Sequence, residues 1–275
     1  MTKNGGKRDK TVLITGSTDG VGRRVAEILA NPGTTLLVHG RDRTRAERVI
    51  ADIRKAGGNG IFYPADFSSL AEVRRLAETV ARDHQQLDLL INNAGIGTGG
   101  SGSERRISSD GHELRFAVNY LAGFLLTRLL LPLLKKSCPA RIVNVASAGQ
   151  QRLDFADVML TRGYSGTRAY CQSKLAQIMF TFDLAEELDE LEVTANCLHP
   201  ATYMDTTMVR ADGITPLSTV DKGAEAILHL AVSPEMEGKS GLYFSGLQSA
   251  RANVQAYDPK ARDRLRILSR QLTDL

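Results

Sequence analysis

Short apolar runs alternate along the chain with longer stretches in which apolar residues recur every three or four positions. Apolar runs of this kind are typical of strands buried on both faces of a parallel sheet, and the periodic stretches are typical of helices that cover it. The pattern predicts an α/β fold, a single domain with a doubly wound parallel sheet of about seven strands and helices on both faces. The predicted strands cover residues 11–14, 34–38, 60–66, 87–91, 141–147, 192–198 and 241–244.

Two of the predicted helices have special features. Residues 114–134 are apolar almost all round but include Asn119, which needs a hydrogen-bonding partner, and helix backbone or a neighbouring strand could supply one. Residues 259–275 are predicted as a charged C-terminal helix, whereas residues 1–9 are expected to be flexible. The C-terminal helix is expected to dock through Leu265, Ile267, Leu268 and Leu272.

The composition of the chain bounds its class. Of its 275 residues, 42% are apolar and 24% charged, which suits one α/β domain. No apolar stretch approaches the roughly eighteen residues of a membrane span, and residues 1–10 lack the apolar centre of a signal peptide. Cys138, Cys171 and Cys197 have neither metal-ligand spacing nor the even number of a disulfide framework. We expect a cytoplasmic protein with reduced thiols, no metal and no membrane partner.

The net charge of +4 and the pI of about 9.0 raise the question of nucleic acid. The densest basic cluster, residues 41–48, is interrupted by Asp42 and Glu47 and has helical periodicity. This pattern is typical of a solvated helix face, so we expect no nucleic-acid partner.

The first predicted strand ends in a glycine-rich turn, residues 15–22, that runs directly into a helix. Gly16, Gly20 and Gly22 let the backbone turn sharply and approach a bulky ligand, while the free N–H groups of the new helix attract an anion. A nucleotide pyrophosphate fits both properties, although a glycine-rich turn without a ligand has the same pattern. The spacing is G-x-x-x-G-x-G rather than the commoner G-x-G-x-x-G.

The end of the second predicted strand bears on the choice of nucleotide. An acidic residue about twenty positions after the glycine turn would bind a free ribose 2′-hydroxyl, but Gly40 and Arg41 stand there. Without a carboxylate a 2′-phosphate is not repelled, and a guanidinium can bind it through two parallel hydrogen bonds. The sequence therefore favours NADP(H) over NAD(H), unless Arg41 is only the first surface residue of the next helix.

Three residues indicate acid–base chemistry. Ser147 closes the fifth predicted strand, at the edge of the sheet where ligands bind. Tyr170 and Lys174 are spaced i, i+4, which places them on one helix face. A free tyrosine has a pKa near ~10, so it acts as a base at neutral pH only when a nearby cation, here Lys174, stabilises its phenolate. A Tyr and a Lys at this spacing are also a common surface pair.

These motifs occur in the order of one known family. Residues 15–22 resemble T-G-x-x-x-G-x-G, residues 92–95 match N-N-A-G, and Ser147 with Tyr170 and Lys174 follows downstream. The chain resembles the short-chain dehydrogenase/reductase family over roughly residues 10–244. Within this family, the chain resembles the branch of retinol dehydrogenases and protochlorophyllide reductases. The segments that carry this resemblance are residues 66–70, 123–127, 172–176 and 198–200.

The resemblance implies a Rossmann-type fold and an oxidoreductase that transfers a hydride between NADP(H) and a carbonyl or alcohol. Tyr170 would be the general acid–base, and Ser147 would orient the reacting oxygen. Lys174 would lower the pKa of Tyr170 and bind the nicotinamide ribose. Asn119 would hold a water in a proton relay.

The resemblance also implies the cofactor contacts. Asp66 would meet the adenine ring, although an Asp at this position is also an ordinary helix N-cap, a place that Ser68 or Ser69 could equally fill. The full expected set is Thr15, Gly16, Ser17, Asp19, Gly20, Val21, Gly22, Arg41, Asp66, Phe67, Asn93, Ala94, Gly95, Tyr170, Lys174, Pro200 and Thr202.

One departure from the family leaves a contact open. Ala201 follows Pro200 where the family usually has glycine, so the threonine near the nicotinamide is either Thr202 or Thr206. Residues 203–215 are expected to form a loop or short helices over the site.

The substrate side is less determined. Residues 148–169 separate Ser147 from Tyr170 and include Phe155 and Tyr164, which would either wall a pocket for a hydrophobic or aromatic carbonyl or be buried in a surface excursion. The glycine-rich residues 97–102 form either a mobile lid or a disordered surface loop.

Other roles and assemblies stay open. A catalytically silent sensor or scaffold would keep the nucleotide fold but would not need the three catalytic candidates together. An epimerase or dehydratase would usually need a larger substrate domain. The family resemblance implies a homodimer or homotetramer through the helix with Tyr170 and the helix that starts near Thr219. Ile178, Met179 and Phe182 would line that interface or face the sheet.

Overall fold

The computed structural model describes residues 9–275 except 101 and 189–191, so the flexibility expected for residues 1–8 lies outside the described residues. One sheet of eight strands has the order β3-β2-β1-β4-β5-β6-β7-β8, and only β8 runs antiparallel to its neighbour. The predicted doubly wound α/β fold is confirmed, with one short strand more than expected. The strands are β1 Lys10–Ile14, β2 Thr34–Gly40, β3 Asn59–Pro64, β4 Leu89–Asn92, β5 Ala140–Val145, β6 Val193–His199, β7 Tyr243–Ser245 and β8 Gln248–Ser249.

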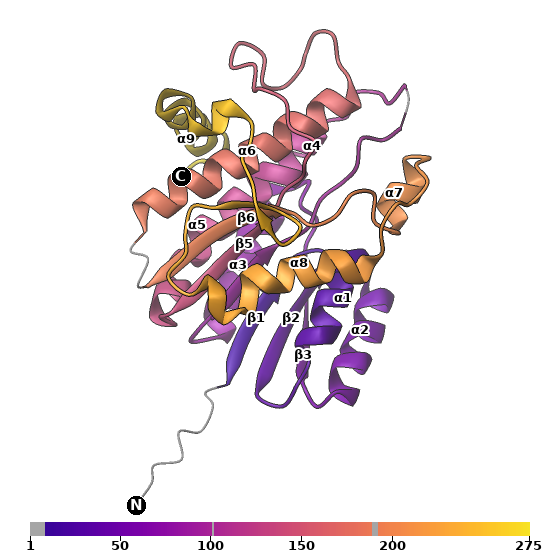
Figure 1. Cartoon of the computed structure of the whole chain (residues 1–275), viewed down its shortest axis with the longest axis vertical. Coiled ribbons are helices and arrows are strands. Elements are labelled where there is room, and N and C mark those ends of the chain that lie inside the picture. Colours follow the sequence, from indigo (N-terminus) through magenta and orange to yellow (C-terminus); the bar gives the residue numbers. More distant parts are fainter. Residues whose placement is uncertain (1–8, 101, 189–191) are drawn as a thin grey trace, which may run out of the picture.

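Helices cover both faces of the sheet (Figure 1). α1, α2 and α8 pack on one face around one apolar core, and α3, α5 and α6 pack on the other around a second. The helices are α1 Gly20–Leu29, α2 Arg43–Lys55, α3 Leu70–Asp83, α4 Leu114–Phe116, α5 Ala122–Lys136, α6 Gly166–Glu187, α7 Thr207–Ala211, α8 Val220–Val232 and α9 Pro259–Thr273, with the π-helical η1 Ala117–Leu121 and the 3-10 helices η2 Pro234–Met236 and η3 Val254–Tyr257.

The order of the strands places a crevice at one edge of the sheet. The chain leaves β1 toward β2 and β3 on one side, and toward β4, β5 and β6 on the other. Ligands of open α/β sheets bind where the strand order reverses in this way, at the carboxyl ends of the strands. The glycine-rich turn after β1 and the residues after β4 therefore meet at the expected binding edge.

The long apolar helix predicted for residues 114–134 consists of α4, η1 and α5 in one continuous run. Among the described residues, Leu114–Lys136 is the one helical run long and apolar enough to cross a membrane, but 67% of its most apolar window is buried inside the protein. It packs between the sheet and α3, as a core helix does. The π-helical turn contains Asn119, and such turns often occur at functional sites.

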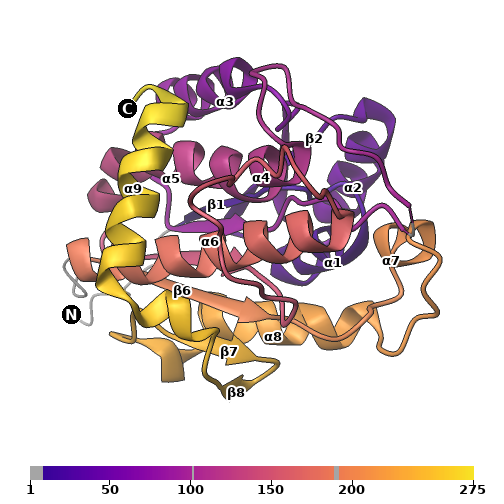
Figure 2. The same cartoon turned by 90° about the horizontal axis from the view of Figure 1, so that it is seen from above.

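The C-terminal helix α9 crosses the outer side of α6 and reaches α3 (Figure 2). Leu265 is buried, and Leu268 and Leu272 pack against the same core, as predicted. The prediction for Ile267 is wrong, because this side chain is 49% exposed. Two positions after Leu265, it points to the opposite side of the helix.

The apolar residues proposed for an interface between copies lie inside the chain. Ile178 and Met179 are fully buried and Phe182 is nearly so, all within the core on the α6 side of the sheet. Of the two alternatives, an interface between copies or packing against the sheet, their burial fits the second.

Candidate active site

Thr15 and Asn93 join the carboxyl ends of β1 and β4. The Thr15 hydroxyl accepts hydrogen bonds from the backbone N–H groups of Asn93 and Ala94, both at 2.9 Å. The Asn93 side-chain amide donates to the carbonyls of Thr15 at 2.9 Å and Gly16 at 3.1 Å. The Thr15 side chain is fully buried, so these residues build the floor of the crevice.

The glycines of the turn are required by its own packing. Gly16 and Gly20 have φ angles of 65° and 55°, which other residues rarely adopt. A Cβ atom added to Gly22 would lie 2.4 Å from the Asn93 side-chain nitrogen. The backbone therefore passes close to Asn93, and α1 begins with its free N–H groups at the crevice.

A buried histidine that the sequence analysis missed supports this turn. His39 Nδ1 accepts a hydrogen bond from the Gly16 N–H at 3.0 Å, and its Nε2 donates to the Ala65 carbonyl at 3.2 Å. Burial lowers the pKa of His39 to about 4, so the ring is neutral. Ser17 donates to the Ile14 carbonyl and Phe67 stacks on the His39 ring. The sequence offered one signal for this role, a histidine near the end of an otherwise apolar strand.

Two expected cofactor contacts, Ser17 and Phe67, are thus buried beneath the turn, and the Val21 side chain is buried in the core. Asp19 stands at the surface of the turn and caps α1 through the Gly20 N–H at 2.8 Å. Its other oxygen accepts hydrogen bonds from Arg45 at 3.0 Å and from the Thr207 hydroxyl at 2.8 Å.

Arg41 and Asp66 stand together after the neighbouring strands β2 and β3. The Arg41 side chain is 72% exposed, and its guanidinium lies 3.5 Å from the Asp66 carboxylate. Burial opposes ionisation of Asp66, but hydrogen bonds from Ser68 and the charge of Arg41 outweigh it and lower the Asp66 pKa. Ser69, not Asp66, caps α3, since its hydroxyl accepts from the Glu72 N–H.

Ser147 and Tyr170 come together beyond the end of β5. Both side chains border Gly149, where an added Cβ atom would lie 3.5 Å from Ser147 Oγ and 3.6 Å from the Tyr170 ring, and Ser147 Oγ accepts a hydrogen bond from the Gly149 N–H at 3.0 Å. Burial raises the pKa of Tyr170 above its ordinary value, and the nearby Ser147 hydroxyl offsets only part of this effect. Tyr170 is therefore a neutral phenol at physiological pH.

Lys174 lies one helical turn after Tyr170, with its Nζ 5.9 Å from the centre of the Tyr170 ring. The buried ammonium donates to the Val145 carbonyl at 2.8 Å and to Gln177 Oε1 at 3.4 Å. Burial lowers the pKa of Lys174 to about 8. Burial is the largest effect on the Tyr170 pKa, and the lowering of that pKa by Lys174 stays a prediction.

Asn119 fixes the chain that follows β4. Its Oδ1 accepts from the Ile96 N–H at 2.7 Å, and its Nδ2 donates to the Ile96 carbonyl at 3.2 Å and to Ser173 Oγ at 3.0 Å. A Cβ atom added to Gly95 would lie 3.2 Å from Asn119 Oδ1 and 3.6 Å from Lys174 Nζ. Gly95 thus leaves room between the two side chains, and the water relay stays a prediction.

The two candidate threonines after Pro200 have different surroundings. Thr202 Oγ1 lies 3.1 Å from His199 Nε2 and is solvent-exposed. Thr206 caps α7, and its methyl group would lie 3.4 Å from a Cβ atom on Gly20. Thr206 is therefore the one beside the glycine turn, while the contact assigned to Thr202 stays a prediction.

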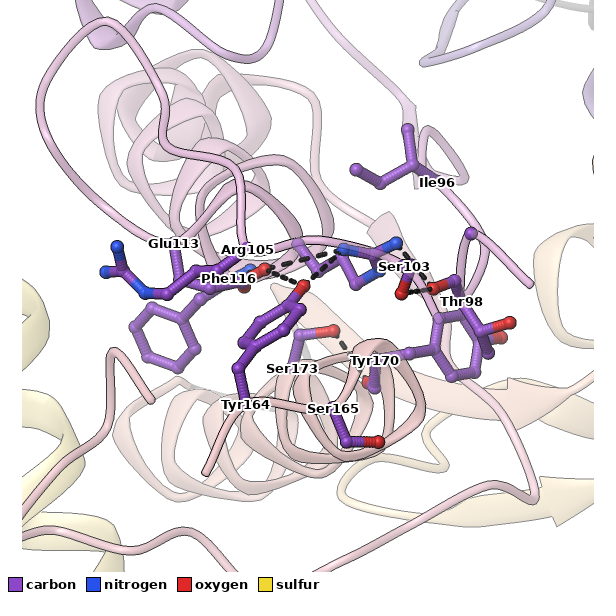
Figure 3. A network of polar contacts seen from close by, with 12 residues as sticks. Ile96, Thr98, Ser103, Arg105, Glu113, Phe116, Tyr164, Ser165, Tyr170 and Ser173 are labelled. Atoms are coloured by element: carbon purple, nitrogen blue, oxygen red, sulfur yellow. Dashed lines mark hydrogen bonds and ion pairs between the residues drawn. The ribbon is translucent and has the colours of Figure 1, made fainter. Parts of the chain in front are cut away.

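A buried polar network that sequence reasoning missed lies beside the catalytic helix (Figure 3). The Arg115 guanidinium donates to the Tyr164 hydroxyl at 2.6 Å, and this hydroxyl donates to the Glu113 carboxylate at 3.1 Å. Arg115 and Glu113 also form an ion pair at 3.7 Å, with side chains 7% and 1% exposed. Tyr164 follows Arg115 by 49 positions and Glu113 by 51, so no spacing in the sequence indicated this network.

We expect Glu113→Gln to lower the free energy of unfolding by about 3 kcal/mol, because it leaves the buried Arg115 charge without its carboxylate. Urea unfolding would measure the loss. Glu104→Gln, which changes an exposed carboxylate nearby, is the matched control and should stay within about 0.5 kcal/mol of the wild type. Equal stability of the two variants would contradict the assigned role of the network.

The segment between Ser147 and α6 buries its own apolar residues. Leu153, Val158 and Leu160 belong to the core, and the Phe155 ring lies 4.6 Å below the Arg264 guanidinium of α9. These residues favour the surface excursion over a pocket wall.

Comparison with known proteins agrees with the geometry. A family model described as short chain dehydrogenase matches residues 10–215. Mouse retinol dehydrogenase 14 is 36% identical over 90% of this chain and 81% of its own length, and human retinol dehydrogenase 13 is 35% identical over 97% and 85%. A short-chain dehydrogenase of Burkholderia cenocepacia, solved with NADP, superimposes with a TM-score of 0.70 and 27% identity over 86% of this chain and 96% of its own.

The fold and the gathered Ser, Tyr and Lys define a Rossmann-type oxidoreductase. The chain belongs to the short-chain dehydrogenase/reductase family, and the predicted likeness to retinol dehydrogenases is confirmed.

Proposed function

We propose that the protein is an NADP(H)-dependent reductase or alcohol dehydrogenase for a small, hydrophobic or aromatic carbonyl substrate. The observation that carries this proposal is the meeting of Ser147, Tyr170 and Lys174 at the carboxyl edge of the sheet. A protein that only sensed the nucleotide would have no use for a phenol beside a serine and a lysine at that edge.

The surroundings of the crevice fit a nicotinamide dinucleotide. The start of α1 offers N–H groups to a pyrophosphate, and the exposed Arg41 offers a guanidinium to a 2′-phosphate. The space left by Gly95 beside Lys174 fits a ribose that accepts hydrogen bonds from the ammonium. The bound cofactor would supply or accept the hydride at its nicotinamide C4.

The protein's own residues handle the proton. Tyr170 donates its phenolic proton to the carbonyl oxygen during reduction and takes it back during oxidation. Ser147 binds the same oxygen and orients it, while the Lys174 ammonium stabilises the phenolate left behind. Because burial raises the pKa of Tyr170, the phenol holds its proton at neutral pH, as the reduction step requires.

Arg41→Ala should weaken NADPH binding about 10- to 100-fold, because a charge-assisted pair of hydrogen bonds to the 2′-phosphate is lost. NADH affinity should stay unchanged. Fluorescence titration with both nucleotides measures the two affinities. Arg43→Ala is the matched control, since the Arg43 guanidinium lies over the Phe62 ring. An equal loss for NADH, or no loss for NADPH, would overturn the role of Arg41.

The proposal is tested by measuring NADPH and NADH oxidation by the purified protein with neutral lipophilic ketones, aldehydes and quinones. Retinal belongs in the panel because two relatives are named retinol dehydrogenases. We expect NADPH-dependent reduction of at least one neutral carbonyl. Tight NADPH binding without turnover of the whole panel would contradict the proposal and favour a sensor.

The proposal includes a cytoplasmic homodimer or homotetramer without nucleic-acid or membrane partners. Ion pairs of Arg41 with Asp66 and of Arg45 with Asp19 occupy much of the basic cluster, which supports a solvated face. An interface between copies would use residues other than the buried ones on α6, and light scattering of the purified protein tests the assembly.

A further inference from the structure

The segment between β6 and α8 is tied to both sides of the candidate active site. At the start of α7, the Thr207 hydroxyl donates to Asp19 in the glycine turn. Beyond the end of α7, Asp212 binds the loop of residues 97–100 that follows β4. One tie reaches the glycine turn, and the other reaches the loop that lies against the start of α6, the helix that carries Tyr170.

The Asp212 carboxylate accepts three hydrogen bonds from this loop. Its Oδ2 accepts from the Thr98 N–H at 2.7 Å and from the Thr98 hydroxyl at 2.8 Å, and its Oδ1 accepts from the Gly99 N–H at 2.9 Å. A Cβ atom on Gly97 would lie 2.5 Å from Oδ2, so only glycine leaves room for the carboxylate. Gly97 thus leaves room for a defined contact between this loop and Asp212.

The same loop is also bound by Arg115, which lies beside the helix that carries Tyr170. Arg115 donates to the Gly97 carbonyl at 2.8 Å and also to the Thr98 carbonyl. Figure 3 shows this network running from Glu113 and Tyr164 to Thr98, beside the helix that carries Tyr170. Arg115 binds carbonyl groups of the loop and Asp212 binds its N–H groups. The two side chains therefore hold residues 97–99 from opposite edges of the backbone.

Asp212 also acts on the acid–base residue itself. Its negative charge contributes to the raised pKa of Tyr170, after the larger effects of burial and of Cys171. Tyr170 is further faced by Ser147, Lys174, Cys171 and Tyr203. Asp212 therefore lies near enough to the reacting group to affect the pH profile.

We propose that Asp212 is a positioning residue that closes the substrate side of the site by fixing residues 97–99, and so governs substrate affinity rather than cofactor affinity. The inference rests on the reductase function proposed above. Hydrogen bonds to a carboxylate are stronger than those to an amide, so Asp212→Asn weakens the closure without removing the side chain.

The test compares Asp212→Asn with Asp205→Asn, which changes an exposed carboxylate on the same segment that pairs with Arg210. We expect Asp212→Asn to raise the KM of a carbonyl substrate about tenfold and to leave the NADPH Kd within about twofold. The apparent pKa of Tyr170 in the kcat profile should fall, because a nearby negative charge is removed. Asp205→Asn should match the wild type in all three measurements.

A second variant isolates the side-chain hydrogen bond. Thr98→Val removes one of the three donors and keeps both backbone N–H groups, so we expect a smaller rise in KM than for Asp212→Asn. In the double variant the two effects on KM should be less than additive, because they remove the same interaction. Full additivity would contradict the proposed contact.

Amide hydrogen exchange of the NADPH complex keeps this proposal separate from the reductase function. Exchange at Thr98 and Gly99 should be faster in Asp212→Asn than in Asp205→Asn, whether or not a substrate has been found. Equal exchange in the two variants overturns the closure, and so does a rise in NADPH Kd as large as the rise in KM. Faster exchange in a protein that reduces no carbonyl overturns the reductase function and the role of Asp212 in substrate affinity.

Discussion

Replacing Tyr170 by Phe should lower kcat for carbonyl reduction by about 10² to 10⁴, the usual contribution of a positioned general acid. The change removes the hydroxyl that would donate the proton and that lies beside Ser147. The ring stays in place, so the NADPH Kd should change by less than about twofold. The expected split between kcat and Kd distinguishes a chemical role from a structural one.

Steady-state kinetics and nucleotide titration on the same preparation measure this split. Tyr257→Phe, which removes a partly exposed phenol at the far end of η3, is the control and should behave as wild type. Parallel loss of turnover and NADPH binding in Tyr170→Phe would assign the residue to cofactor binding. Unchanged turnover would exclude it as the proton donor.

Replacing Lys174 by Met should lower kcat at least about a hundredfold and weaken NADPH binding about tenfold. Methionine keeps the length of the buried chain but removes the ammonium that would stabilise the Tyr170 phenolate and bind the ribose. With a Lys174 pKa of about 8, the wild-type ammonium is charged below about pH 8 and loses its proton above it. Its stabilising effect on the phenolate is therefore present in the neutral range and fades as pH rises.

The pH dependence of alcohol oxidation tests this role, because oxidation needs Tyr170 as a base. In Lys174→Met the rate should rise only at higher pH than in the wild type, since no cation lowers the pKa of the phenol. Lys222→Met, an exposed lysine on α8, is the control. An unshifted profile with an unchanged kcat would contradict the role of Lys174.

The sequence predicted the parts of this protein that depend on local pattern. Apolar runs located the strands of the sheet, and the spacing of Tyr170 and Lys174 after Ser147 located the catalytic candidates. These features need only neighbouring residues or a fixed helical interval. The order of the strands then follows from the rules for parallel sheets, and it brings the glycine turn to the same edge.

Features that depend on contacts between distant residues could not be predicted. Asp212 and Thr98 are 114 positions apart, and Arg115 meets Tyr164 across 49 positions, so no spacing indicated either pair. The π-helical turn at Asn119 left no mark on an apolar pattern that continues through it. The raised pKa of Tyr170 depends on burial, which a motif does not report.

The most direct test of hydride transfer uses NADPH that carries deuterium at both hydrogen positions of the nicotinamide C4. The protein is given this nucleotide and a carbonyl from the panel, and the alcohol product is examined by mass spectrometry and NMR. We expect deuterium on the carbinol carbon with a single stereochemistry, formed by the wild type and not by Tyr170→Phe. An unlabelled alcohol, or equal labelling by the Tyr170→Phe variant, would contradict this expectation.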